Sequence, residues 1–482
     1  MGIRKPILAL ALLMGAGRMA SAGSYFVDSQ GGSDLNAGKS ADQAWQTLAT
    51  ANKAALKAGD SLLFKCGGAW TGQLTLKASG AEHVPIVVSS YGSGAAPVFE
   101  NPGKGNGNAV NISGDWIVLE NVLVRNVFQV GISIDNGADH DILRNLEVTD
   151  CGIGAYMAGQ YGLVTQSHFH DMHMVVNTPG GNDDNGAVGA VFANSDNEVS
   201  YNRFIRCVGP SADYGVDGGA VEIWAEKDLR NIYVHHNFAY RCCGFFEIGG
   251  LGFAVEGVRV AYNELVDCFG LSFLFVNNSG DYTITLKDYR FENNTLVVHD
   301  CPGEKIWTCI AWDTPSEPGV FTMRNNLFYV FNADRILVNV TSPVEDHNLV
   351  FHGGTAFFQA NFTPSATDIV GKDPLLQNPG TCADNGDYRL KPGSAAIHAG
   401  TALGYAADLR GVAVPTGGLP EIGAYEFADG VTAVVPSAGE ASINSGRKGS
   451  KGSKGGEAMQ AWRSGLHQGR NLSGRRVANN LP

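Results

Sequence analysis

The segments "VSYNRFIRC" (residues 199–207), "VHHNFAYRC" (234–242) and "VAYNELVDC" (260–268) repeat one pattern, an apolar run around a central Asn. The pattern recurs at intervals of 22 to 35 residues, centred on Asn121, Asn145, Ser167, Asn202, Asn237, Asn263, Asn294, Asn326 and Asn348. A short strand cannot bury its apolar face alone, whereas stacked turns bury it against their neighbours. An Asn at one corner of every turn can bond up and down such a stack. The repeat therefore predicts a β-solenoid, because a β-sandwich gives no reason for this recurrence.

Several cysteines keep the same register as the Asn residues. They are Cys151, Cys207, Cys242, Cys268 and Cys301, each five to seven residues after its Asn. A free Cys behaves as a small buried hydrophobe, so we expect a column of interior thiols. Disulfides remain the alternative for an exported chain.

The repeats resemble those of right-handed parallel β-helix proteins, the pectin-lyase-like superfamily. The entry segment at residues 25–70 is similar to that family, as are "GDYRLKPGSAAIHAG" (386–400) and "LPEIGAYEF" (419–427). The resemblance implies an all-β fold, a right-handed parallel β-helix with a short N-terminal capping helix and a C-terminal cap. Trp45, Leu48 and Leu56 give that helix an apolar face over about residues 42–57.

Five segments are expected along the chain. Residues 1–22 resemble a secretory signal peptide, with Arg4 and Lys5 before a short apolar run and a small-residue cleavage pattern at 20–22. The N-terminal cap and first turns follow over 23–110, the β-helix repeats over 111–375 and the C-terminal cap over 376–428. Residues 429–482 are expected to form a flexible basic tail, because residues 430–482 are Gly/Ser-rich and carry eight Lys and Arg against two Glu. We expect a monomer, secreted to the extracellular space or the periplasm.

Charge and hydropathy exclude two classes of partner. The formal net charge of −13 argues against nucleic acid. No run after the signal peptide is long and apolar enough for a membrane-spanning helix. A polysaccharide is the partner expected for this fold, bound in an outer groove walled by the insertions at 171–189 and 208–221.

A pair of glutamates is the main candidate for the chemistry of this groove. In "DYGVDGGAVEIW" (213–224) the final strand "GAVEIW" aligns with "GFFEIG" (244–249) of the next turn, which puts Glu222 beside Glu247. If the flanking apolar residues face inward, both glutamates face outward, roughly 4.8 Å apart at the backbone. Two carboxylates this close favour either a raised pKa or a shared cation. A raised pKa suits the acid of a retaining glycosidase, and a shared cation suits a Ca²⁺ site.

Other residues of the candidate site follow from chemistry and from the family resemblance. Relatives that cleave polyuronates by β-elimination use Ca²⁺ or a basic residue against the substrate carboxylate, and a basic residue to remove a proton. "EIWAEK" (222–227) is similar to the Glu–Lys region of one Ca²⁺-dependent lyase family, although Ala220 stands where a second ligand would be expected. The catalytic candidates are Glu222, Glu247, Lys227, His235 and Arg241. Tyr214 and Trp224 are candidates for sugar stacking, and Asp213, Asp217, Glu222 and Glu247 for binding Ca²⁺.

These residues lead to a functional hypothesis with two alternatives. The hypothesis is a secreted enzyme that depolymerises an acidic extracellular polysaccharide by β-elimination. A glycoside hydrolase that uses Glu222 and Glu247 is the nearest alternative. A non-catalytic solenoid that binds polysaccharide at a surface is the alternative from another class.

Overall fold

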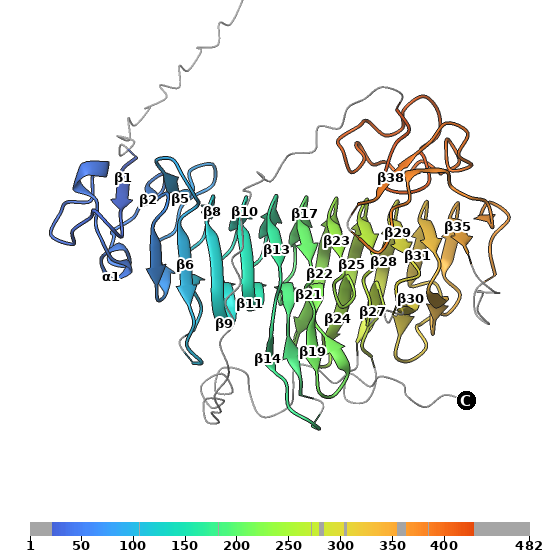
Figure 1. Ribbon diagram of the computed structural model, residues 1–482, viewed down its shortest axis with the longest axis horizontal. Helices are drawn as coiled ribbons and strands as arrows, with labels where there is room; N and C mark the ends of the chain where they lie inside the picture. Colours follow the sequence, from blue (N-terminus) through green and yellow to red (C-terminus); the bar gives the residue numbers. More distant parts are fainter. Residues whose placement is uncertain are drawn as a thin grey trace, which may run out of the picture.

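The computed structural model describes residues 22–428 except 106, 182, 271, 279–283, 303–305, 354–362 and 384. The expected signal peptide, apart from its last residue, and the basic tail lie outside these residues. The described chain winds into a solenoid of stacked strands (Figure 1). None of its helices is long and apolar enough to cross a bilayer.

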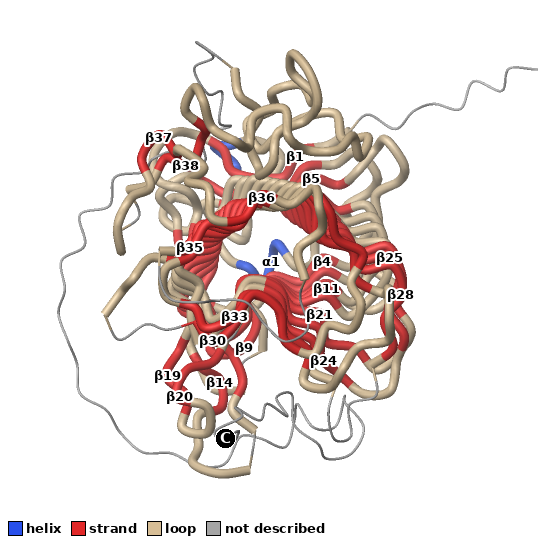
Figure 2. Tube along the Cα trace, turned by 90° about the vertical axis from the view of Figure 1, so that its right-hand side faces the viewer, coloured by secondary structure: helices blue, strands red, loops and turns tan. Residues whose placement is uncertain are grey.

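Three parallel sheets form the solenoid and surround its core (Figure 2). The first sheet contains β1 (Ser24–Val27), β2 (Ser61–Lys65), β5 (Ile86–Tyr91), β8 (Ile117–Glu120), β10 (Ile142–Arg144), β12 (Leu163–Thr165), β17 (Glu198–Ser200), β22 (Leu229–His235), β25 (Ala254–Ala261), β28 (Thr285–Glu292), β31 (Phe321–Arg324) and β34 (Val344–Asp346). The second sheet contains β3 (Ala69–Thr71), β6 (Val98–Asn101), β9 (Leu123–Ile134), β11 (Glu147–Met157), β13 (His168–His170), β18 (Arg203–Ile205), β23 (Phe238–Tyr240), β26 (Glu264–Val266), β29 (Thr295–Val298), β32 (Leu327–Val330), β35 (Leu349–His352) and β36 (Ile369–Val370).

The third sheet shares the long strands β9 and β11 with the second, because both continue around the corner. Its other strands are β4 (Leu74–Leu76), β7 (Val110–Ile112), β16 (Val188–Phe192), β21 (Gly219–Ala225), β24 (Phe246–Gly250), β27 (Leu274–Val276), β30 (Ile306–Trp312) and β33 (Ala333–Val338). Antiparallel hairpins are formed by β14 (Met174–Val176) with β15 (Asn185–Gly186), β19 (Gly209–Ser211) with β20 (Gly215–Asp217), and β37 (Leu376–Asn378) with β38 (Asp387–Leu390). The parallel solenoid predicted from the repeat is thus confirmed.

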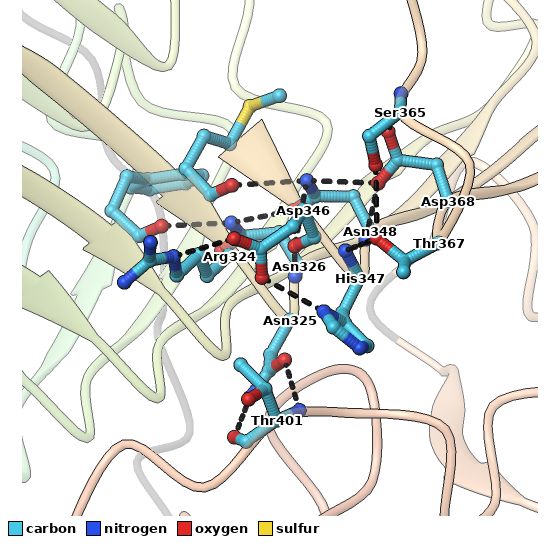
Figure 3. Close-up of polar contacts among 12 residues, drawn as sticks. Arg324, Asn325, Asn326, Asp346, His347, Asn348, Ser365, Thr367, Asp368 and Thr401 are labelled. Carbon is cyan, nitrogen blue, oxygen red and sulfur yellow. Dashed lines mark hydrogen bonds and ion pairs between the residues drawn. The ribbon is translucent and has the colours of Figure 1, made fainter. Parts of the chain in front are cut away.

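The recurring Asn residues form a ladder, in which each Asn is hydrogen-bonded to the Asn of the next turn. This Asn ladder runs along the corner between the first and second sheets. The backbone N–H of Asn237 donates to Asn263 Oδ1 over 2.9 Å, and that of Asn263 donates to Asn294 Oδ1 over 3.0 Å. The side-chain amide of Asn263 also donates to Asn294 Oδ1 and to the carbonyl of Val234 in the preceding turn. The ladder ends at Asp368, which accepts from the backbone N–H of Asn348 over 2.7 Å (Figure 3). Repeated hydrogen bonds thus stabilise every turn from Ser167 to Asp368.

Two of the predicted ladder positions are wrong by one residue. Asn121 and Asn145 have φ angles of 59° and 49° and lie outside the core, at the corner position that Tyr201, His236 and Tyr262 occupy in later turns. Asn tolerates this left-handed backbone region better than most residues, so an Asn is favoured at either position. The inward positions of these turns belong to the next residues in the chain, Val122 and Leu146, which are buried.

The cysteine column is confirmed for four of its five members. Cys151, Cys207, Cys242 and Cys268 are free thiols and fully buried. Cys301 is an exception, because it forms a disulfide with Cys382, 81 residues further along the chain. Its partner lies in the segment that follows the solenoid, where the repeat gives no register.

The N-terminal helix is shorter than predicted. A 3₁₀ turn, η1 (Ala41–Gln43), precedes the helix α1, which covers only Leu48–Ala51 and buries Leu48 and Ala51 in the core. Trp45 lies outside the helix, because its backbone is bridged to Val27 of β1. Thr47 begins the helix as its N-cap, with its hydroxyl accepting from the backbone N–H of Thr50. α1 lies at the N-terminal end of the solenoid (Figure 1).

Residues 376–427, here called the flank segment, pack along the side of the solenoid over its later turns (Figure 1). Besides the Cys301–Cys382 disulfide, the carbonyl of Ala407 lies 3.2 Å from His236 Nε2, and Asn293 Nδ2 donates to the carbonyl of Glu421. The hydroxyl of Tyr425 donates to the carboxylate of Glu264. The flank segment therefore covers part of the corner that carries the Asn ladder.

Candidate functional site

The two glutamates are direct partners in the third sheet. Glu222 of β21 pairs in register with Glu247 of β24, as the alignment of their segments predicts. Val221 and Ile223 are fully buried in the interior cluster, so strand alternation turns Glu222 to the outer face. Phe246 and Ile248 are buried in the same cluster, so Glu247 between them also faces outward. Both carboxylates thus lie outside the core, with backbones roughly one strand spacing of 4.8 Å apart.

The pair is more deeply buried than an open groove floor would be. Glu222 is 9% exposed and Glu247 is 4% exposed. Their neighbours in the same outward column are apolar: Val191 precedes Glu222, and Phe275 follows Glu247. The two carboxyl groups therefore occupy a polar position between apolar side chains on one face of the sheet.

Trp224 lies beside the pair, two residues after Glu222 on the same strand. Its ring covers Gly249, since a Cβ added to that glycine would come within 2.6 Å of Trp224 Cζ3. Any larger residue at position 249 would displace the indole. The ring is partly buried, which leaves some of its surface available to a ligand.

Asn277 adds a polar group that the sequence interpretation missed. It follows β27, and its backbone N–H donates to the carbonyl of Ile248 over 2.9 Å, which places it next to Gly249. Asn277 is fully buried, and neither its amide nitrogen nor its amide oxygen has a hydrogen-bond partner among the residues that the structure describes. An unsatisfied buried amide costs about 1–3 kcal/mol, and it can recover this by bonding a ligand or water. Aligning "SFLFVNN" (272–278) with "GFFEIGG" (244–250) would have found this position.

The two predicted wall insertions form adjacent hairpins. β14–β15 and β19–β20 extend together from the solenoid (Figure 1). Asn177 Nδ2 donates to the carbonyl of Pro210 over 2.8 Å, and the backbone N–H of Ala212 donates back to Asn177 Oδ1 over 2.8 Å. Tyr214 lies in the turn between β19 and β20, where its backbone N–H donates to Ser211 Oγ. The second hairpin leads directly into β21, which carries Glu222.

The four predicted Ca²⁺ ligands do not form one group. Asp213 lies with Asp183 and Asp184, and one carboxylate oxygen from each lies within 4.8 Å of the others. Asp217 is 2% exposed, and its Oδ1 accepts from the backbone N–H of Gly218. Asp213 therefore belongs to the hairpin group and not to the glutamate pair, whereas the role of Asp217, which lies at the base of the hairpin two residues before β21, stays a prediction.

Asp184 organises the carboxylate group in the hairpins. Burial alone would raise its pKa, but hydrogen bonds from the backbone N–H of Asp213, the hydroxyl of Ser211 and the backbone N–H of Thr178 hold the pKa below its usual value. These bonds explain why an acidic residue sits at a buried position between two hairpins.

The three predicted bases lie on different sides of the solenoid. Lys227 follows β21 and is exposed, with Nζ 3.5 Å from Asn136 Oδ1. His235 ends β22 in the first sheet and contacts Glu198 and His236. Arg241 follows β23 of the second sheet, with Nη1 3.5 Å from the carbonyl of Cys382. Only Lys227 belongs to the strand end that carries Glu222, so assigning His235 and Arg241 to the same site is wrong.

A second group of titratable residues lies on the outer face of the second sheet. His170 Nδ1 lies 2.8 Å from Asp171 Oδ2, and His170 Nε2 lies 3.3 Å from Glu147 Oε1. Arg206 donates to both oxygens of Asp171, over 2.5 and 2.8 Å. Burial lowers the pKa of His170, but hydrogen bonds to the two carboxylates outweigh it and raise the pKa to about 9.

This group predicts a pH-dependent contribution to stability. Because the folded pKa of His170 is raised from 6.5 to about 9, its stabilisation is full below about pH 6.5 and is lost as pH rises through about 9. We expect His170→Gln to lower the melting temperature more at about pH 6 than at about pH 10. Thermal unfolding of both proteins at several pH values measures this. A difference that stays constant or grows with pH would contradict the assignment.

The comparisons with known proteins agree with this fold. A family model described as "right handed beta helix region" matches residues 108–333. No curated protein matches the chain in sequence. XylC, solved in complex with xylose, is similar in structure at a TM-score of 0.50 and 10% identity, with 73% of this chain and 87% of XylC covered.

Two lyases of known structure are similar at lower TM-scores. Pectate lyase Pel9A gives a TM-score of 0.48 at 18% identity, covering 84% of this chain and 96% of the lyase. An alginate lyase from Paenibacillus sp. str. FPU-7 gives a TM-score of 0.43 at 16% identity, covering 63% of this chain and 97% of the lyase.

The sheets, the ladder and the family model together define a right-handed parallel β-helix protein. The matched region agrees with the resemblance of the repeats to the pectin-lyase-like superfamily. The likeness to solved structures shows the fold alone.

Proposed function

We propose that this protein is a secreted enzyme that cleaves glycosidic bonds of an extracellular polysaccharide at Glu222 and Glu247. The observation that carries the proposal is the register pairing of two outward, nearly buried carboxyl groups in the third sheet. Trp224 beside them offers a ring face for a sugar, and the unsatisfied amide of Asn277 offers a donor and an acceptor for its hydroxyls. The fold of the neighbours named above is compatible with this activity.

Hydrolysis is the reaction that the pair supports best. In a retaining glycoside hydrolase, one carboxyl group gives a proton to the leaving oxygen while the other attacks the sugar, and the two groups lie about 5 Å apart. Adjacent strands hold the backbones of Glu222 and Glu247 at about this spacing, roughly 4.8 Å. Water then releases the sugar while the first residue takes the proton back. This chemistry needs only residues that the chain supplies.

β-Elimination is the second candidate, and Lys227 favours it. Lys227 follows the end of β21 and is exposed, and its amine lies 3.5 Å from Asn136 Oδ1, so it could turn toward a sugar bound along β21. Glu222 and Glu247, with the amide oxygen of Asn277, are hard oxygen donors of the kind that Ca²⁺ prefers. A bound Ca²⁺ would neutralise the carboxylate of an acidic sugar, while Lys227 would remove the C5 proton next to it. The electron pair of that C–H bond would form the C4–C5 double bond as the C4–O glycosidic bond breaks, and the leaving oxygen would take a proton from water. His235 and Arg241 cannot share this role, since they lie on other sheets.

The products of polysaccharide cleavage separate these chemistries. Incubation with a panel of polyuronates, glycosaminoglycans and neutral glycans should release reducing ends. Hydrolysis gives these ends without new ultraviolet absorbance, whereas elimination gives unsaturated ends that absorb. Release of neither from any glycan would leave only a binding role and would overturn the proposal.

A calcium titration tests the second candidate without relying on activity. If the pair holds Ca²⁺, the cation stabilises the folded protein and raises its melting temperature with concentration. Glu222→Gln should weaken this shift. An Asp183→Asn variant serves as the matched control, because it removes a carboxylate from the hairpin group only.

A further inference from the structure

Arg259 differs from most arginines of the solenoid in its surroundings. Eight other arginines in the described part of the chain form ion pairs with carboxylates: Arg125, Arg144, Arg206, Arg230, Arg290, Arg324, Arg389 and Arg410. Arg259 lies on the outer face of β25 in the first sheet, is exposed, and has no ion pair with any described residue. Its guanidinium lies 5.8 Å from the ring centroid of Tyr233. An unpaired guanidinium is unusual in a chain with a net charge of −13.

Two tyrosines lie close to this guanidinium. Tyr233 of β22 is the direct register partner of Arg259, and Tyr405 comes from the flank segment, where its hydroxyl donates to Glu292. Burial raises the pKa of both phenols, and the charge of Arg259 opposes this rise for both. Arg259 therefore lies over a ring of the sheet and near enough to a ring of the flank segment for its charge to act on that phenol.

His235 supports the ring of Tyr233. The two rings are stacked with centroids 3.8 Å apart. His235 Nδ1 lies 2.6 Å from His236 Nδ1, and His235 Nε2 lies 3.1 Å from Glu198 Oε1. These contacts fix the orientation of His235 and, through it, that of Tyr233.

We propose that Arg259, Tyr233 and Tyr405 form a second glycan-binding site, which takes a carboxylate-bearing sugar of an acidic polysaccharide, while His235 holds the ring of Tyr233 in place. The guanidinium would bind the sugar carboxylate through two parallel hydrogen bonds, and a tyrosine ring would contact the sugar face. The site lies on the first sheet, whereas Glu222 and Glu247 lie on the third. It rests on the proposed function only in that its ligand is a polysaccharide.

Such a site would hold a polymer on the enzyme between cuts. A chain bound at two places dissociates more slowly, because the second contact becomes intramolecular. In an acidic protein, the Arg259 guanidinium also offsets part of the repulsion between an anionic polymer and carboxylates such as Glu198 and Glu292, which lie nearby. The site thus predicts an acidic polysaccharide as the substrate.

Affinity electrophoresis on an inactive background tests this site directly. The Glu222→Gln/Glu247→Gln protein should be retarded in gels that contain polygalacturonate or alginate, and not in gels that contain xylan. Adding Arg259→Gln should weaken this binding about tenfold, equivalent to about 1.4 kcal/mol, and salt should weaken it further. Arg144→Gln is the matched control, because Arg144 lies on the same sheet but is paired with Glu120.

Three results would overturn the site. They are an absence of retardation by either acidic polymer, equal retardation with and without Arg259→Gln, and equal weakening by Arg144→Gln. Cleavage is measured separately on the wild-type protein, so the two proposals can fail independently. Retention of acidic polymers by a protein that cuts no glycan would support this site while overturning the proposed function.

Discussion

Glu222→Gln and Glu247→Gln are each expected to lower kcat by about 10²–10⁴-fold on the substrate that the wild-type protein cleaves. The amide keeps the size of the side chain but can neither donate a proton as an acid nor attack as a carboxylate. Folding should change little, because both side chains lie outside the interior cluster. Initial rates and circular dichroism of the purified variants measure both effects.

Glu226→Gln is the matched control for these variants. Glu226 follows the strand that carries Glu222 and is exposed, so its loss should leave the rate within about twofold of wild type. If both pair variants retained full activity, or if either failed to fold, the pair would not be the catalytic site.

Asn263→Ala is expected to lower the free energy of unfolding by roughly 4 kcal/mol, since several buried groups lose partners at about 1–3 kcal/mol each. Asn263 is fully buried, and its Oδ1 accepts from both the backbone N–H and the side-chain amide of Asn237. The substitution also leaves the carbonyl of Val234 without this donor. Urea unfolding followed by circular dichroism gives the difference.

Asn145→Gly is the matched control for the ladder. Asn145 lies outside the core with a positive φ, a conformation that Gly adopts freely, and its side chain donates to Asn121 Oδ1 at the exposed corner. Its loss should cost about 0.5 kcal/mol or less. Similar losses for Asn263→Ala and Asn145→Gly would show that the ladder does not stabilise the turns in the way described.

The ladder shows how far the sequence predicts this fold. The repeat was sufficient to predict the parallel solenoid, because few other folds place an inward-facing Asn in one apolar segment after another. It could not separate Asn121 and Asn145 from the ladder, since the corner position beside it also favours Asn. Burial of Val122 and Leu146, which only the structure shows, corrects the register.

The candidate site was predictable only where the strand register extends to it. Glu222 and Glu247 could be paired from two aligned segments, because adjacent turns of a solenoid repeat their register. His235 and Arg241 are near Glu222 in sequence but not in space, since fewer than twenty residues carry the chain onto another sheet. Sequence distance therefore misleads in a solenoid, whereas position within a turn does not.

Contacts outside the repeat were not predictable. Cys382 pairs with Cys301 because the flank segment turns back along the solenoid, and no periodicity describes that path. The same return brings Tyr405 beside Arg259 and Glu292. The second glycan site combines residues of the sheet and of the flank segment, so it could be seen only in the structure.

A crystal structure of the Glu222→Gln variant with an oligosaccharide of the identified substrate tests the central claim most directly. We expect the bond cut by the wild-type protein to lie between residues 222 and 247, with a sugar against Trp224 and a hydroxyl bonded to Asn277. An oligosaccharide whose scissile bond lies on another sheet, with the pair free of sugar, would contradict it.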